Sequence, residues 1–76
     1  MVPFAERLQK ARQRKKMMQK EVAKYLNMTE RSYQHYEGGT RRPSYEILVT
    51  LADLFDVTTD YLLGRTEEPG SVQLPR

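Results

Sequence analysis

The sequence predicts an all-α protein consisting of one compact domain with five short helices, and three observations support this prediction. Apolar residues recur at helical spacing almost throughout the chain. No segment shows the sustained period-two alternation that is typical of half-buried strands. The chain has 76 residues and no cysteine, so a single small apolar core must stabilise the fold without disulfides or thiolate metal sites.

The first predicted helix covers residues 4 to about 14. Phe4, Leu8 and Ala11 fall at i, i+4 and i+7 and give this helix one apolar face. Basic residues occupy other positions of the same segment, and we expect their side chains to face water: Arg7, Lys10 and Arg14.

A second helix is predicted to begin near Gln19 and a third to run from about residue 30 to residue 37. The inner face of the second helix consists of Val22, Ala23 and Leu26. Asn27 is expected to end it, because asparagine tolerates the left-handed conformation found at helix ends. Thr29 is a favourable N-cap for the third helix, and Glu30 lies near the positive end of its dipole.

The fourth predicted helix carries the most apolar stripe of the sequence and should form the centre of the core. Gly38 and Gly39 are expected to stop the third helix, and the sequence TRRP then forms a loop. Ser44 can cap the fourth helix. Its apolar stripe comprises Ile47, Leu48, Leu51, Ala52 and Phe55.

The fifth predicted helix is short, and a tail follows it. Thr58 or Thr59 can cap the sequence DYLL, and Gly64 is expected to close it. The segment 65–76, RTEEPGSVQLPR, contains two prolines and few apolar residues, so we predict a flexible C-terminal tail. The folded domain is therefore predicted to span residues 1–64.

Residues 19–37 have the spacing of a helix-turn-helix. A small Ala23 allows the two helices to cross closely, Asn27 accepts the tight turn, and Tyr33 and Tyr36 face inward. The polar neighbours of these tyrosines then project outward, where a recognition helix meets base edges in the major groove. These outward residues are Glu30, Arg31, Gln34 and His35.

The charge distribution is more informative than the net charge of +3. Residues 1–42 carry a net charge of +7 and residues 43–76 a net charge of −4. This asymmetry suits a surface that approaches a polyanion, although solvated helix faces are an equally simple explanation. The N-terminus lacks an apolar signal core and no apolar run is long enough to span a bilayer, which predicts a soluble, cytoplasmic protein without a membrane partner.

The segment QKEVAKYLNMTERSYQHYEGGTRRPSYEILVTLADLFDVTTDYLLG resembles the lambda-repressor-like family, the helix-turn-helix domains of phage repressors and Cro proteins. The resemblance covers residues 4–64 and depends on Gln19, YEGG, RRPS and the final DYLLG. It implies a five-helix DNA-binding domain whose partner is double-stranded DNA. It also implies a homodimer that binds a two-fold symmetric operator.

The resemblance assigns roles to single residues. Gln19 matches a glutamine that contacts phosphate, while Glu30, Arg31, Gln34 and His35 match the positions that read bases. Arg31 is our choice for a bidentate contact with guanine, because its planar fork matches the O6 and N7 acceptors. Glu30 either accepts from a cytosine amino group or only stabilises the helix dipole, and the two interpretations are about equally supported.

Further positions match backbone contacts of the family. The phosphate-contacting set is predicted to include Ser32, Gly39, Thr40, Arg41 and Arg42, with the amides around Gly38 to Thr40 as additional donors. A merely solvated loop is the alternative for the two arginines. Arg12 and Glu37 match a partly buried ion pair that sets the angle of the recognition helix.

Three departures from the family pattern affect these expectations. The second helix lacks an ordinary N-cap because Met18 precedes Gln19, which costs about 1 kcal/mol. Tyr33 replaces a small β-branched residue, and we expect its hydroxyl to lie at the protein surface or near a phosphate. Asn27 in place of the common turn glycine is a mild change.

Three classes of function are compared. A sequence-specific regulator, most simply a repressor, agrees best with base-readable side chains on a basic half of the chain. An adaptor or antitoxin-type subunit with the same fold is the alternative. An enzyme is disfavoured, since no convergent catalytic set is present, and His35 has no second ligand for a metal, so no cofactor is expected.

The surface of the expected homodimer is predicted at the fifth helix, where Val57 and Tyr61 offer apolar groups beyond the central core. The alternative is that these residues, together with Leu62 and Leu63, simply close the core.

Overall fold

The computed structural model describes residues 3–67 and shows five helices in this range. They are α1 (Phe4–Arg14), α2 (Gln19–Tyr25), α3 (Glu30–Gly38), α4 (Tyr45–Phe55) and α5 (Thr59–Leu62). No strand occurs among the described residues, so the prediction of an all-α fold with five short helices is confirmed.

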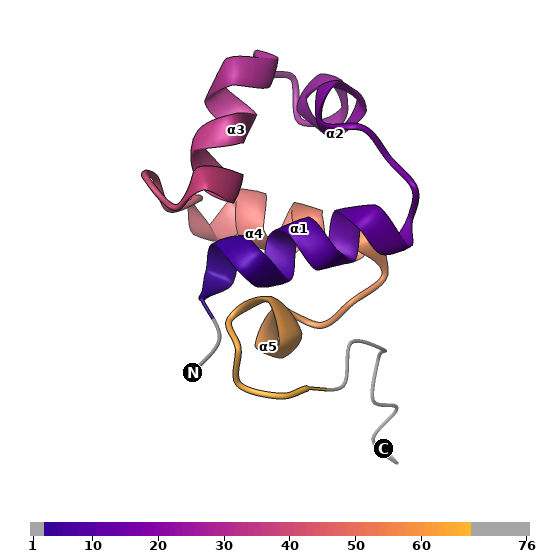
Figure 1. The fold of residues 1–76 in the computed structure, drawn as a ribbon, viewed down its shortest axis with the longest axis vertical. Coiled ribbons are helices and arrows are strands. Elements are labelled where there is room, and N and C mark those ends of the chain that lie inside the picture. Colours follow the sequence, from indigo (N-terminus) through magenta and orange to yellow (C-terminus); the bar gives the residue numbers. More distant parts are fainter. Residues whose placement is uncertain (1–2, 68–76) are drawn as a thin grey trace.

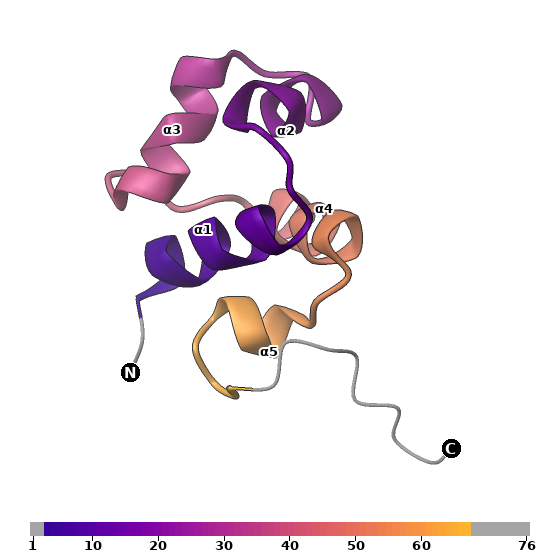
Figure 2. The same cartoon turned by 45° about the vertical axis from the view of Figure 1, so that its right-hand side comes forward.

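The helix-turn-helix pair occupies one end of the molecule. In both orientations α2 and α3 lie together at the top, α1 crosses the middle, and α5 lies at the opposite end (Figures 1 and 2). Helix α1 contacts α3, α4 and α5, whereas α2 packs mainly against α3. Helix α1 is therefore the support on which α3 rests.

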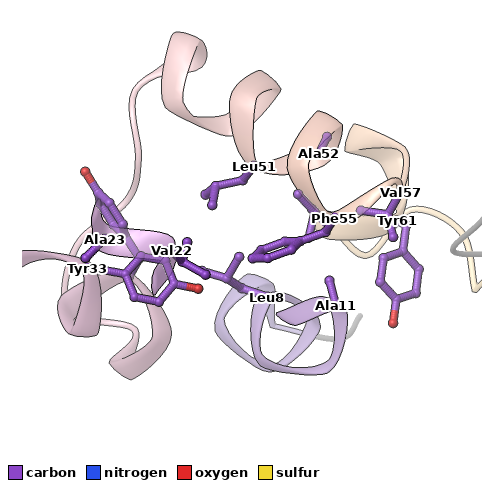
Figure 3. Close-up of a cluster of buried hydrophobic side chains, with 12 residues drawn as sticks. Leu8, Ala11, Val22, Ala23, Tyr33, Leu51, Ala52, Phe55, Val57 and Tyr61 are labelled. Atoms are coloured by element: carbon purple, nitrogen blue, oxygen red, sulfur yellow. The ribbon is translucent and has the colours of Figure 1, made fainter. Parts of the chain in front are cut away.

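The core draws on all five helices, as the close-up shows (Figure 3). Its largest fully buried side chains come from every one of them: Leu8, Val22, Tyr33, Leu51, Phe55 and Leu62. The predicted α4 stripe is confirmed, with Leu51, Ala52 and Phe55 buried and Ile47 and Leu48 packed at the margin. Burial of these side chains supplies the main stabilising free energy, because no disulfide is available.

Most predicted helix boundaries are confirmed by local hydrogen bonds. The hydroxyls of Thr29, Ser44 and Thr58 accept from the amides of the third residue beyond each cap, at 3.1, 3.2 and 3.0 Å. The fifth helix begins at residue 59, one residue before the predicted DYLL. Gly38 still belongs to α3, and only Gly39, with φ of 82°, ends it in the left-handed conformation.

The connections around α2 use positive backbone φ angles. Asn27 has φ of 59°, as predicted, and Lys16 has φ of 57° in the link between α1 and α2. The side chain of Met18 makes no capping bond, which confirms the missing N-cap. Glu21 partly compensates, since its carboxylate accepts from the Met18 amide at 2.7 Å.

The prediction that Arg7 faces water is wrong. Arg7 is only 6% exposed, and its guanidinium carbon lies 4.4 Å from the ring centroid of Tyr61. Its Nη1 also donates to the carbonyl of Thr66 at 2.8 Å. A long arginine side chain can cover an apolar surface while its charged group lies on the face of an aromatic ring, and this arrangement joins α1 to α5.

Thr66 lies within the segment that was predicted to be a tail. Residues 68–76 of that segment lie outside the described residues. Within residues 3–67, none of the helices has the length and apolar character that crossing a membrane requires.

The side chains at the α5 end are arranged differently from the predicted dimer surface. Val57 and Tyr61 are each 5% exposed and belong to the core, so they offer almost no surface to a second copy. Leu62 is also buried, whereas Leu63 is 41% exposed. The reason is that α5 packs against both α1 and α4, which covers its inner face.

Candidate nucleic-acid interface

The outer side of α3 carries four polar side chains that the sequence assigned to base reading. Glu30, Arg31 and Gln34 are exposed and His35 is half-buried. Residues 30 and 34 lie one turn apart, as do 31 and 35, so the structure places all four along one strip of the helix. Because Tyr33 and Tyr36 fill the opposite side, this strip is free to meet an external partner.

The buried carboxylate of Glu37 is the centre of the contact between α1, α2 and α3. Arg12 of α1 donates to it twice, from Nε at 2.6 Å and from Nη2 at 3.1 Å. Gln19 of α2 donates from Nε2 at 3.1 Å, and the hydroxyl of Tyr33 donates from within α3. Each carboxylate oxygen thus accepts two hydrogen bonds, which satisfies a charge that is costly to bury alone.

This environment keeps Glu37 ionised. Burial disfavours the charged form, but hydrogen bonds from Arg12, Tyr33 and Gln19 outweigh it and lower the pKa of Glu37. The pKa of Arg12 is raised by its hydrogen bonds to the same carboxylate. The ion pair therefore fixes α3 against α1 near neutral pH.

The expectation that the Tyr33 hydroxyl lies at the surface or near a phosphate is wrong. Tyr33 is fully buried, and its hydroxyl is bonded to Glu37 inside the domain. Burial and then the hydrogen bond to the Glu37 carboxylate raise its pKa far above the ordinary value, so the hydroxyl remains a neutral donor. Its ring also meets Tyr36 edge to face, with centroids 6.3 Å apart.

Arg12 contacts a third part of the chain beyond α1 and α3. Its Nη1 donates to the carbonyl of Met17 at 2.9 Å, in the link that leads into α2. Gln9 of α1 adds a hydrogen bond from Nε2 to the carbonyl of Glu37 at 3.2 Å. The link between α1 and α2 and the end of α3 are therefore held by α1, which limits relative movement of the helix-turn-helix pair.

Gln19 makes a second contact that the sequence analysis missed. Its Oε1 accepts from Nε2 of Gln34 at 3.2 Å, and the same Nε2 lies 3.4 Å from a carboxylate oxygen of Glu30. A predicted phosphate-contacting residue is thus bonded to a predicted base-reading residue. Spacing in the sequence gives no sign of this pair, since it depends on how α2 and α3 cross.

The backbone amides at the C-terminal end of α3, which were predicted as additional phosphate donors, have intramolecular acceptors. The amides of Gly39, Thr40 and Arg41 all donate to the carbonyl of His35. They close the helix end, where carbonyls lack intrahelical partners, so a phosphate contact by the Gly39 or Thr40 amide would compete with these bonds. Thr40 Oγ1 lies 2.9 Å from His35 Nδ1, which leaves Nε2 of that ring for an external partner.

Other predicted phosphate-contacting side chains are accessible. Arg41 and Arg42 are exposed and have no acidic partner within residues 3–67. Ser32 Oγ accepts from the Thr29 hydroxyl at 3.0 Å, which leaves the proton of the Ser32 hydroxyl available. Within residues 3–67, no group of three His, Cys, Asp or Glu side chains is arranged to hold a metal ion.

Comparison with known proteins gives a consistent result. The helix-turn-helix family model (HTH_3) matches residues 8–62, more than half of the chain. The chain is 42% identical over 66 residues to the uncharacterized HTH-type transcriptional regulator YqaE of Bacillus subtilis, covering 86% of this chain and 57% of YqaE. It is 44% identical over 63 residues to the HTH-type transcriptional regulator AnsR (83% of this chain, 54% of AnsR) and 42% identical over 64 residues to ImmR (84% and 50%), both from Bacillus subtilis. The chain thus spans about half the length of the curated relatives it matches.

Proposed function

Since this chain belongs to the helix-turn-helix family, of the lambda-repressor-like type, we propose that it is a sequence-specific DNA-binding transcriptional regulator. In this proposal α3 enters the major groove of a DNA duplex and presents Glu30, Arg31, Gln34 and His35 to base edges. The observation that carries the proposal is the position of these polar side chains on the outer side of a helix whose inner side is fixed by Glu37.

The surroundings of α3 support phosphate contacts on both sides of that strip. Arg41 and Arg42 follow the end of α3 and are exposed. Gln19, the first residue of α2, donates one N–H of its carboxamide to Glu37, and the second N–H is available for a phosphate. Ser32 adds a hydroxyl donor on α3 itself. Contacts of this kind set the register of a protein on DNA, while the strip on α3 determines sequence preference.

The direct test is selection of bound sequences from a randomised duplex library at near-physiological salt, where non-specific phosphate attraction is weak. We expect one site to be enriched. Arg31→Ala should then relax the preference at one position of the site and cost about 1–3 kcal/mol of binding free energy.

A matched variant separates base reading from phosphate contact. Arg42→Ala should weaken binding to all duplexes equally and reduce the slope of log K against log salt by about 1. Two variants that both bind as the wild type does would refute this mode of docking. A folded wild type that enriches no sequence would refute the proposed function itself.

The finer proposal is a repressor that acts as a homodimer on a two-fold symmetric operator in the cytoplasm, with the folded domain in residues 1–64. Two recognition helices would then lie about 34 Å apart on one face of the duplex. The buried Val57 and Tyr61 are not part of the proposed dimer surface, whereas the exposed Leu63 at the end of α5 is available for it. An enriched site with inverted half-sites, together with two copies per duplex in sedimentation, tests this step.

A further inference from the structure

We propose that Gln34 reads DNA only as a hydrogen-bond acceptor, because Gln19 and Glu30 hold the donor side of its carboxamide. This inference deepens the proposed function and depends on it. Gln34 is then a specificity-determining residue that offers DNA an acceptor and no donor. We call this fixed hydrogen-bond direction its polarity, and Gln19 is the residue that sets it.

The polarity originates at the buried carboxylate of Glu37. An ionised carboxylate only accepts hydrogen bonds, so Gln19 has to direct its Nε2 group toward Glu37, 3.1 Å away. The carboxamide of Gln19 is planar, and its Oε1 is then left facing Gln34, one turn earlier in α3. Turning this amide over would place two oxygens together inside a partly buried contact, which is strongly unfavourable.

The orientation of Gln19 in turn fixes the orientation of Gln34. Nε2 of Gln34 lies 3.2 Å from Gln19 Oε1 and 3.4 Å from Glu30 Oε2, and both of these atoms are acceptors. The two N–H groups of Gln34 are therefore directed at the protein. Its Oε1 has no hydrogen-bond partner among residues 3–67 and is the group left for a base.

This polarity predicts which bases Gln34 accepts. A free glutamine often binds adenine with two hydrogen bonds, donating to N7 and accepting from the N6 amino group. Gln34 lacks the free donor and keeps only the second of these bonds. It therefore favours bases with a major-groove amino group, adenine or cytosine, and disfavours guanine and thymine, which present acceptors at O6, N7 and O4.

The DNA test begins with site selection by the wild type and by Gln34→Ala, which locates the position whose preference Gln34 sets. We expect adenine or cytosine there, with guanine or thymine binding roughly tenfold more weakly. Where adenine is selected, 7-deazaadenine should bind within about twofold of adenine, because no donor approaches N7. A roughly tenfold loss with 7-deazaadenine would show a bidentate contact and overturn the proposal.

Gln19→Met is the decisive variant, because methionine keeps the size of the side chain but cannot orient Gln34. The discrimination against guanine and thymine at this position should fall to about threefold or less. Gln13→Met, at an exposed position of α1, is the matched control and should leave the selected site unchanged. Unchanged discrimination in Gln19→Met, or a Gln34→Ala variant that alters no position, would also overturn the proposal.

A measurement without DNA separates failure of this proposal from failure of the proposed function. The side-chain amide of Gln34 should show a high 15N order parameter in the free wild type and become as mobile as exposed Gln13 in Gln19→Met. Equal mobility of Gln34 in wild type and variant would refute the orientation of Gln34 whatever the DNA result. An ordered Gln34 in a folded protein that enriches no DNA site would instead refute the proposed function, and the reading role of Gln34 with it.

Discussion

Removing the hydroxyl of Tyr33 tests whether the hydrogen bonds to Glu37 stabilise the domain. Tyr33→Phe keeps the buried ring and its edge-to-face contact with Tyr36, so no cavity larger than the hydroxyl is created. Of the two donors to Glu37 Oε2 within residues 3–67, the variant deletes the Tyr33 hydroxyl and keeps Arg12 Nε. The change is therefore confined to one hydrogen bond with a buried, ionised acceptor.

The expected loss follows from the type of bond. Hydrogen bonds to charged groups contribute about 1.5–3 kcal/mol, so the free energy of unfolding should fall by roughly 2 kcal/mol. For a domain of this size that corresponds to a decrease in Tm of roughly 8–16 °C. The loss stays below the 3–5 kcal/mol typical of breaking a buried ion pair, because Arg12 and Gln19 still bind the carboxylate.

Tyr36→Phe is the control, since it removes the same atom from the same helix. Tyr36 is 6% exposed, and no buried polar side-chain atom in residues 3–67 lacks a partner, so its hydroxyl has access to water or a partner. Its hydroxyl makes no bond to Glu37, and we expect a loss of about 0.5 kcal/mol or less. Urea unfolding near pH 7, with equal m-values, measures both variants. A Tyr33→Phe loss no larger than that of Tyr36→Phe would contradict the role assigned to Glu37.

Three further predictions concern stability. Gly39→Ala should lower the free energy of unfolding by about 1–2 kcal/mol, because Gly39 has a positive φ. Gly38→Ala, at the helical position before it, should raise the free energy of unfolding by roughly 0.5–1 kcal/mol. Thermal unfolding measures both variants, and equal effects would contradict the left-handed helix end. Arg7→Met should lower the free energy of unfolding by about 1–2 kcal/mol, because it removes the guanidinium from the face of the Tyr61 ring. Arg14→Met, at an exposed position of the same helix, is the control and should lower it by less than about 0.5 kcal/mol. Urea unfolding measures both variants. The pKa of Glu37 lies below its unfolded value of about 4.3, so its stabilisation is complete above that pH and lost as the pH falls through the folded pKa. Unfolding free energies between about pH 5 and pH 2 should therefore decrease less in Glu37→Gln than in the wild type.

The features that the sequence predicted correctly depend on short-range signals. Thr29, Ser44 and Thr58 cap helices because each hydroxyl meets an amide only three residues away. Asn27 ends α2 through its own backbone preference. Such signals lie within one turn of the chain, so they can be read without knowing how the helices pack.

The features that the sequence analysis missed depend on contacts between distant segments. Arg7 was assigned to water because helical spacing alone does not show that Tyr61 of α5 lies beside it. The hydroxyl of Tyr33 was expected at the surface or near a phosphate because spacing alone does not show that Arg12 of α1 and Gln19 of α2 hold the Glu37 carboxylate inside the domain, where it accepts this hydroxyl. For the same reason, the pair of Gln19 and Gln34 became visible only once the crossing of α2 and α3 was known.

The carboxylate shared by three helices has a consequence for how this sequence can diverge. Replacing Glu37 by an apolar residue in one step would leave Nε and Nη2 of the partly buried Arg12, and the buried hydroxyl of Tyr33, without their acceptor. Replacing Arg12 first would instead leave a buried carboxylate without its cation. A lineage descending from this chain can therefore abandon the arrangement only through coordinated substitutions, and we expect positions 12, 33 and 37 to be inherited or exchanged as a set.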